Sequence, residues 1–449
     1  MLRMTRRTPV VVFILIAAAA VAIAQGQPGQ GTPGARPGSG REPEFPIPDI
    51  REYKPESTLV VPQHPVPKAR FPVIDFHGHP PQLTSPEALA SVVKALDDLN
   101  VQRMVVNNPQ LRGDLLKQWI GVANASPYAD RFIYFTSIGF GREIGPGFGQ
   151  AAAEQLEADI KAGAKGIQEI AKSFGINVKK ADGSRLQLDD PELDPIWETA
   201  ARLNIPVFIH TADPQKFWDP IDYTNERWLE LALFRDRRYQ DPAFPRFETL
   251  MAERDRLFKK HPKTKFVTAH LGWHANDLAR LGRMFDEMPN VYSEIGAVLY
   301  DIGRQPRFAH DFFVKYQDRI LFGKDSYQPD EYPYYWRVFE TNDEYFDYYR
   351  DYHAFWKLYG IGLPDDVLRK LYYQNAMRIV PGDVFRWFDL SIRRPDSTQA
   401  SGADIRRRTS ITSSRGDSIA TSSANCHAIA CGAASARSLR HSVPPSHSR

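Results

Sequence analysis

Eight short runs of β-branched and aromatic residues recur through the middle of this 449-residue chain, with helical patterns between them. The runs are residues 71–77, 101–106, 132–138, 164–170, 205–210, 265–270, 291–295 and 319–322. Strands that alternate with helices pair in parallel. No break is long enough to divide the eight units, so the pattern favours an α/β fold closed as a (β/α)8 TIM barrel over an open sheet.

Six of the intervening segments are predicted to be helices. Two of them, residues 85–99 and 190–203, open with the capping residues Ser85 and Asp190, each followed by proline. The other four are residues 151–162, 247–260, 275–288 and 307–316, which have similar length and apolar periodicity.

The two ends of the chain differ from this middle. Three arginines precede an apolar run that ends near Ala24, which is the layout of a signal peptide over residues 1–24 and predicts a periplasmic or secreted protein without a stable membrane span after cleavage. Residues 25–70 are rich in Gly and Pro and are interpreted as a linker. The folded domain is predicted over residues 71–385, and the Ser-, Ala- and Arg-rich tail, residues 396–449, is predicted to be disordered.

Charge and cysteine content narrow the functional classes. The formal net charge of +3 comes from the two ends, and the region between them is slightly acidic, so nothing favours binding to nucleic acid. The only two cysteines, Cys426 and Cys431, lie in the tail. A metal ion in the folded region would therefore be held by histidine and carboxylate.

Histidines and one aspartate stand at the ends of predicted strands. His77 and His79 close the first run, and residues two apart in a strand point to the same side. His210 ends the fifth run, His270 ends the sixth, and Asp325 follows the eighth. The carboxyl ends of barrel strands form the active sites of such folds, so we expect these five side chains to meet there.

This set predicts a metal centre that acts on a small-molecule substrate. Three imidazoles and a carboxylate suit one divalent ion, Zn²⁺ first and Mn²⁺ as the alternative, with a position left for water. Such an ion lowers the pKa of its bound water to about 7. Asp325 can bind the metal and accept the proton of the water, while His270 can orient the substrate or stabilise developing negative charge.

The sequence resembles the amidohydrolase superfamily, in particular its amidohydrolase-related branch, which also contains metal-dependent decarboxylases. The resemblance spans residues 71–379 and rests on His77-Gly78-His79, His210, "AHLG" with His270, and "LFGKD" with Asp325. It implies that His77, His79, His210 and Asp325 bind one metal ion, with His270 beside it. Lys324 departs from the family pattern, which usually has a small residue there; if the strand continues, Lys324 points away from the site, and otherwise it adds a charge.

Three further features leave alternatives open. The fourth run, "AKGIQEI", could supply a ligand to a second metal through Glu169 or Lys165, although the branch usually binds one. Arg227, in the long connection after the fifth run, could meet a substrate carboxylate or form a structural salt bridge. The aromatic residues of segment 332–359 could wall a pocket, but their spacing from Tyr345 to Tyr359 favours a helix packed on the barrel.

The predicted function is hydrolysis of a C–N or C–O bond of a small molecule by metal-activated water. One alternative is a non-oxidative decarboxylase of an aromatic or unsaturated acid that uses the same metal. Another is a binding protein on a barrel scaffold without chemistry. The substrate and a homo-oligomeric state are left open.

Overall fold

The computed structural model describes residues 46, 49–50 and 52–382. The predicted signal peptide, most of the predicted linker and the tail, residues 396–449, lie outside this range. Each of the eight predicted strands is present: β1 (Val73–His79), β2 (Val101–Val106), β3 (Phe132–Tyr134), β5 (Ile167–Ile170), β7 (Pro206–Ile209), β8 (Lys265–Thr268), β9 (Val291–Glu294) and β10 (Ile320–Leu321). A further short strand, β11 (Asp325–Ser326), follows β10 after three residues.

The strands form a parallel sheet that closes on itself. One part has the order β11-β1-β2-β3, and the other has the order β10-β9-β8-β7-β5. Two connections join the parts: a parallel bridge between Thr136 and Ile167, and a hydrogen bond of 3.0 Å from the backbone N–H of Phe76 to the carbonyl of Phe322. The (β/α)8 barrel predicted from the eight runs is therefore confirmed.

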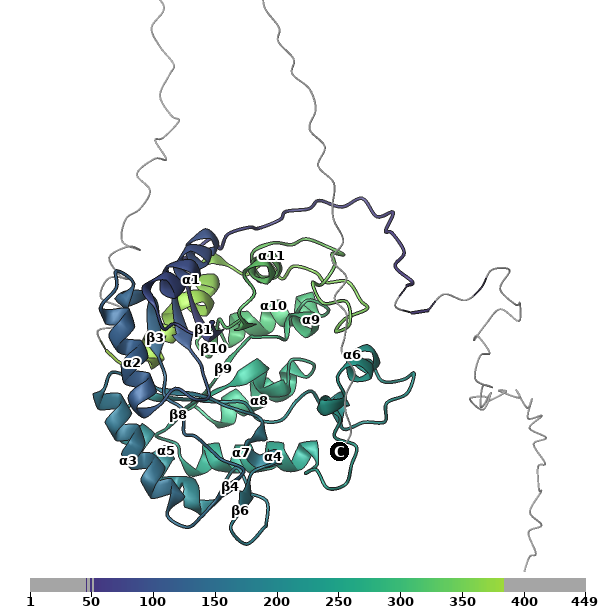
Figure 1. Cartoon of the computed structure of the whole chain (residues 1–449). Coiled ribbons are helices and arrows are strands. Elements are labelled where there is room, and N and C mark those ends of the chain that lie inside the picture. Colours follow the sequence, from purple (N-terminus) through teal and green to yellow (C-terminus); the bar gives the residue numbers. More distant parts are fainter. Residues whose placement is uncertain (1–45, 47–48, 51, 383–449) are drawn as a thin grey trace, which may run out of the picture. The chain divides into compact units, whose positions relative to one another are not determined.

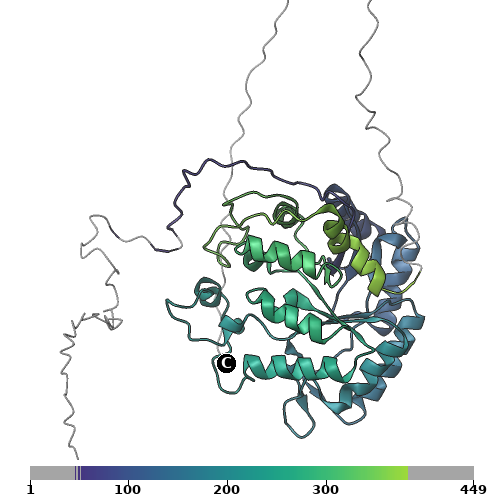
Figure 2. The ribbon, with the colours of Figure 1, turned by 180° about the vertical axis from the view of Figure 1, so that it is seen from behind.

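Helices surround the strands (Figures 1 and 2). The main helices are α1 (Pro86–Leu99), α2 (Gly113–Asn124), α3 (Phe148–Lys161), α5 (Asp194–Arg202), α7 (Phe247–Lys260), α8 (Leu278–Glu287), α10 (Pro306–Lys315) and α11 (Tyr332–Glu340). In α1 the side chain of Ser85 accepts a hydrogen bond from the N–H of Ala88, as its capping position predicts. Helix α2 was not predicted from the sequence; its N-cap position is Arg112, whose side chain makes no capping hydrogen bond.

Aromatic rings fill the barrel interior below the carboxyl ends of the strands. The ring of Phe76 on β1 lies 5.5 Å from that of Phe135 and 5.4 Å from that of Phe208, and all three side chains are fully buried. Buried rings in edge-to-face contact at these distances are densely packed. The interior is a packed core that supports the strand ends.

Shorter elements lie in the connections between the main helices and strands. They are β4 (Glu143–Ile144), β6 (Lys179–Lys180), α4 (Ser173–Ile176), α6 (Trp228–Leu233), α9 (Leu299–Ile302), α12 (Asp365–Arg369) and α13 (Asn375–Ile379). Among the helices of the described part of the chain, none has the length and apolar character needed to cross a membrane.

The helix predicted from Tyr345 to Tyr359 is wrong. Helix α11 ends at Glu340, and residues 341–360 instead form a loop in which Phe346 and Leu358 pair in an antiparallel bridge. Tyr345 adopts a left-handed backbone conformation with φ of 57°, which a helix interior does not allow. The spacing of the aromatic residues led to a wrong prediction, because tertiary packing of the rings determines which side chains of this loop are buried, and helical periodicity does not.

Candidate metal centre

Six acidic and histidine side chains converge at the carboxyl ends of the strands. They are His77 and His79 on β1, Glu169 on β5, His210 directly after β7, His270 two residues after β8, and Asp325 on β11. Parallel strands bring their carboxyl ends to one rim of the barrel, so residues distant in sequence meet there. The structure thus places all five predicted site residues at this rim and adds Glu169 to them.

Donor atoms from β1, β5 and β11 lie close together at this rim, in two groups of three: His77, His79 and Asp325, and His77, Glu169 and His270. The Nε2 atoms of His77 and His79 lie 3.3 and 3.1 Å from Oε2 of Glu169. The same two Nε2 atoms each lie 3.8 Å from Oδ1 of Asp325. Donors about 2.1 Å from a tetrahedral ion are about 3.4 Å apart, so these spacings suit a single divalent ion.

The imidazoles of His79 and His270 are oriented by backbone carbonyls. Nδ1 of His79 lies 3.0 Å from the carbonyl of Asn107, and Nδ1 of His270 lies 2.7 Å from the carbonyl of Gly296. A carbonyl only accepts hydrogen bonds, so each Nδ1 carries the proton and each Nε2 keeps a free lone pair. Hydrogen bonds of this kind fix the tautomer of a metal-ligating histidine.

A buried carboxylate lies beside the ring of His77. Oε1 of Glu294, at the end of β9, lies 3.0 Å from Nδ1 of His77, and it also accepts a hydrogen bond of 2.7 Å from the backbone N–H of His270. Both Glu294 and His77 are fully buried. Nδ1 of His77 thus faces Glu294, while its Nε2 faces Glu169 and Asp325.

The arrangement of these atoms fits a cation. The Nε2 atoms of His77 and His79 face the carboxylates of Glu169 and Asp325, and nitrogen and oxygen donors of this kind are the ligands that divalent ions such as Zn²⁺ take in proteins. Nε2 of His77 and Nε2 of His210 are buried without a hydrogen-bond partner. Unpartnered buried nitrogens are costly in a folded protein, and a bound ion would satisfy the one on His77.

His210 lies on the far side of Glu169. Its Nδ1 is 2.6 Å from Oε1 of Glu169, whereas His77 and His79 face Oε2. The ring of His210 also packs edge-on against that of His270, with centroids 4.5 Å apart. Glu169 therefore stands between the β1 histidines and the histidine that follows β7.

Electrostatic coupling keeps the carboxylates charged. Burial alone would raise the pKa values of Glu169, Glu294 and Asp325, but the histidines around them, His77 first, outweigh burial and lower all three. In return, Glu294 and Glu169 outweigh the burial of His77 and raise its pKa well above the usual value. Burial and the neighbouring His210 lower the pKa of His270 to about 4. The centre therefore combines three carboxylates that stay charged with imidazoles whose pKa values are shifted in opposite directions.

A second buried carboxylate, Asp75, joins the strands that carry the ligands. Its Oδ1 accepts hydrogen bonds from the N–H of His77 at 3.0 Å and of Lys324 at 3.1 Å. Its Oδ2 accepts a hydrogen bond of 2.6 Å from the hydroxyl of Tyr332 on α11. Asp75 thus ties the first ligand strand to the residue before Asp325.

The strand does not continue through Lys324, because β10 ends at Leu321 and β11 starts at Asp325, where φ is 76°. The Lys324 side chain is almost fully buried, and its ammonium pairs with Glu331 and lies near the ring of Tyr349. The extra charge is therefore balanced within this connection.

Sequence reasoning missed Glu294 and Asp75 and left Glu169 as one of two options. Lys165, the other option, precedes β5 by two residues and its N–H bonds to Tyr134. Glu294 lies one residue before the end of the predicted strand of residues 291–295, so the rule that selected His210 and His270 at strand ends could have found it. Asp75 gave no such signal, because it lies inside the first strand.

Imidazoles and carboxylates gathered at the carboxyl rim of a (β/α)8 barrel define a metal-binding barrel enzyme. The family model described as amidohydrolase matches residues 64–382, and the chain belongs to this family. The resemblance inferred from the sequence is thereby confirmed, and with it the prediction that the protein is an enzyme.

Several solved structures have a similar fold. An uncharacterised TIM-barrel protein from Bordetella bronchiseptica is 17% identical, with a TM-score of 0.44 over 69% of this chain and 98% of its own. A dihydroxybenzoic acid decarboxylase from a Polaromonas species, solved with manganese and 2-nitroresorcinol, is 15% identical, with a TM-score of 0.41 over 74% and 100%. A protein from Acinetobacter baumannii, described as a probable 2-pyrone-4,6-dicarboxylic acid hydrolase, is 14% identical, with a TM-score of 0.37 over 68% and 98%. The search of curated proteins found no match.

Proposed function

We propose that this protein is a metal-dependent hydrolase that cleaves a C–N or C–O bond of a small molecule. One observation carries the proposal: the Nε2 atoms of His77 and His79 lie within 3.1–3.8 Å of carboxylate oxygens of Glu169 and Asp325 at the carboxyl rim of the barrel. Zn²⁺ is the preferred ion for such a donor set, and Mn²⁺ is the alternative.

His77, His79 and Asp325 form one group of donors that would hold the ion, and Glu169, which groups with His77 and His270, would be a further ligand. His210 supports Glu169 through its Nδ1. A divalent ion bound there supplies Lewis-acid polarisation of the substrate and makes a hydroxide-like nucleophile available at neutral pH. The side chain of Asp325 remains about one-third exposed, so it can take a proton at the solvent side of the centre.

The structure narrows the role that we propose for His270. Its Nδ1–H donates to the carbonyl of Gly296, so Nε2 offers a lone pair and no proton. His270 therefore orients the substrate by accepting a hydrogen bond and does not donate one to developing negative charge.

Metal analysis and product analysis test the proposal. The purified protein should contain a divalent ion, and both His77→Ala and Asp325→Ala should lose it. With added Zn²⁺ or Mn²⁺, a panel of amides, lactones and hydroxybenzoates should yield a product that carries oxygen from ¹⁸O-labelled water. A wild type without metal, or variants that keep it, would reject the centre.

The alternative function, decarboxylation, would use the same metal centre. It is distinguished from hydrolysis by its products. Release of carbon dioxide from a hydroxybenzoate, with no ¹⁸O in the remaining product, would replace the hydrolase assignment with a carboxy-lyase assignment. The metal centre itself would stand in either case.

We further propose export from the cytoplasm, on the basis of the charged and apolar pattern of residues 1–24. Expression of the full chain followed by N-terminal sequencing of the periplasmic or extracellular fraction should give a mature chain that starts near Gln25. A protein that stays in the cytoplasm with Met1 intact would contradict this.

A further inference from the structure

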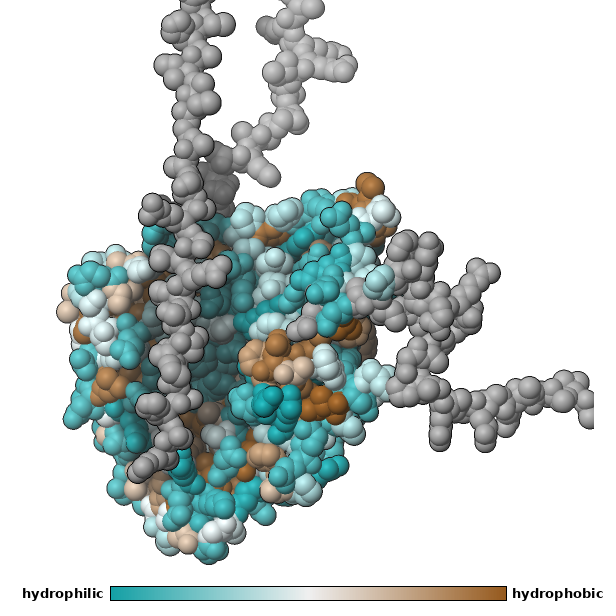
Figure 3. All heavy atoms as spheres, turned by 45° about the vertical axis from the view of Figure 1, so that its right-hand side comes forward, coloured by the Kyte–Doolittle hydropathy of each residue, from teal (hydrophilic) through white to brown (hydrophobic). Residues whose placement is uncertain are grey.

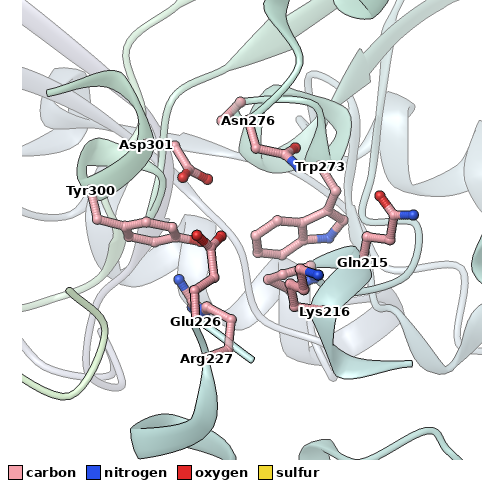
Figure 4. A pocket seen from close by; sticks show the side chains of 10 residues that line it. Gln215, Lys216, Glu226, Arg227, Trp273, Asn276, Tyr300 and Asp301 are labelled. Carbon is pink, nitrogen blue, oxygen red and sulfur yellow. The ribbon is translucent and has the colours of Figure 1, made fainter. Parts of the chain in front are cut away.

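A small pocket lies beside the metal centre and takes no part in holding the ion (Figure 4). The connection after β7 supplies Lys216, Glu226 and Arg227, while Trp273 follows β8 and Tyr300 belongs to α9. These elements lie on the side of the barrel that carries α6 (Figure 1), and the surface turned forward in Figure 3 is hollowed and largely hydrophilic, with hydrophobic residues gathered beside the hollow. The cavity volume is about 20 Å³, room for about two water-sized atoms.

Arg227 is a cation of this pocket with unused hydrogen-bond donors. Its side chain is 3% exposed, and its Nη2 donates to Glu230, while Nε and Nη1 have no hydrogen-bond partner. The guanidinium carbon lies 4.2 Å from the centre of the Tyr300 ring. A buried, charged donor without an acceptor is costly, and an anionic ligand would satisfy it.

The acidic groups of the pocket are paired with other cations. Glu226 binds Arg304 through two hydrogen bonds of 2.8 and 3.0 Å, and Asp301 lies 2.6 Å from the same guanidinium. Lys216 pairs with Asp219 at 2.9 Å. The local charges are therefore balanced in pairs, and the free donors of Arg227 are what distinguishes the pocket.

Trp273 connects this pocket with the metal centre. Its ring lies 4.5 Å from that of His270 and 5.7 Å from that of His210, and it also lines the pocket. A flat or apolar molecule that packs on this indole would have one end near the metal centre and the other near Arg227. A molecule held in this way needs a hydrogen-bond acceptor, preferably an anionic one, at the end that lies near Arg227.

We infer that this pocket is a subsite for the carboxylate of an acidic substrate, with Arg227 as its donor and Trp273 as the surface for the body of the substrate. The inference rests on the proposed function in that it assigns the class of molecule on which the metal centre acts. The structural salt bridge to Glu230 accounts for Nη2 of Arg227 but leaves Nε and Nη1 for the ligand.

Calorimetric titration of the full chain with benzoate, and with benzamide as its neutral counterpart, tests the subsite without any need for turnover. Benzoate should bind the wild type, and Arg227→Met should weaken its binding about tenfold or more, because a charge-assisted hydrogen bond is lost. The affinity for benzamide should change by less than about twofold. Arg235→Met, at an exposed position of the same connection, is the matched control and should retain benzoate binding.

The outcomes separate this inference from the proposed function. Benzoate that fails to bind the wild type, or that binds a folded Arg227→Met protein as tightly, overturns the subsite even if a hydrolase activity is found. Binding that depends on Arg227 supports the subsite even if no hydrolysis is found. If Arg227→Met does not fold, Arg227→Lys keeps the charge but alters the donor geometry, and unchanged benzoate binding by that variant would also reject the inference.

Discussion

Nδ1 of His210 lies 2.6 Å from Oε1 of Glu169, while the other oxygen of this carboxylate faces the two histidines of β1. One side chain on β5 thereby couples the ends of three strands. Oε2 of Glu169 belongs to the metal centre, and Oε1 of Glu169 supports His210. A substitution at Glu169 should therefore affect both the metal centre and the position of His210.

Replacement of Glu169 by glutamine should weaken binding of Zn²⁺ by about 10- to 100-fold, because the amide keeps the size of the side chain but loses its charge. Equilibrium dialysis followed by metal analysis measures the effect. Glu198→Gln, at an exposed position of α5, makes the same chemical change away from the centre and should bind metal like the wild type. Equal affinities of the two variants would remove Glu169 from the ligand set.

Asp75 should contribute to the stability of the fold through the hydrogen bonds that it accepts. Asp75→Ala leaves the N–H groups of His77 and Lys324 and the hydroxyl of Tyr332 without their acceptor, and we expect the free energy of unfolding to fall by about 3–5 kcal/mol. Tyr332→Phe removes one of these bonds and should cost about 1–3 kcal/mol. Urea denaturation measures both, and a larger loss for Tyr332→Phe than for Asp75→Ala would contradict this order.

Close packing at Gly323 should make this position intolerant of a methyl group. A Cβ there would lie 2.2 Å from Oε2 of Glu294 and 2.7 Å from Cβ of His77. Gly323→Ala should therefore displace His77, weaken metal binding and lower the free energy of unfolding by about 1–3 kcal/mol. Gly121→Ala in α2 is the matched control: a Cβ there meets nothing within 4 Å, and the variant should be about 0.5–1 kcal/mol more stable. Thermal denaturation and metal titration of both variants check the pair.

The buried charge network around Glu230 should make stability depend on pH in acid. Burial would raise the pKa of Glu230, but His353, Arg227 and Arg237 outweigh it and lower the pKa to about 2. A carboxyl whose pKa is lower in the folded than in the unfolded chain stabilises the fold above its unfolded pKa of about 4.3, and this contribution is lost as the pH falls toward 2.

Glu230→Gln should accordingly lower the free energy of unfolding at pH 7 by about 2–4 kcal/mol. The difference from the wild type should shrink between about pH 4.3 and pH 2, as the wild-type carboxyl takes up its proton. Urea denaturation at pH 7, 4 and 3 follows it, and a difference that is the same at all three would show that the charge of Glu230 contributes nothing.

The local pattern of the chain was enough to predict most of the barrel. Strand β2 and helix α7 have the limits predicted for residues 101–106 and 247–260, because β-branched residues and apolar periodicity act within each segment. The loop of residues 341–360 was mispredicted as a helix, since its aromatic spacing is helical while its hydrogen bonds, such as that between Phe346 and Leu358, join residues far apart in the segment.

The sequence by itself determined that His77, His79, His210, His270 and Asp325 stand at strand ends, because strand period and barrel topology put those positions on one rim. Only the tertiary structure decided which atoms meet. Glu169 lies between the β1 histidines and His210, and Glu294 orients His77, through contacts between strands that are distant in the chain. No local propensity encodes such contacts, since they depend on the register of parallel strands and on how the buried side chains pack.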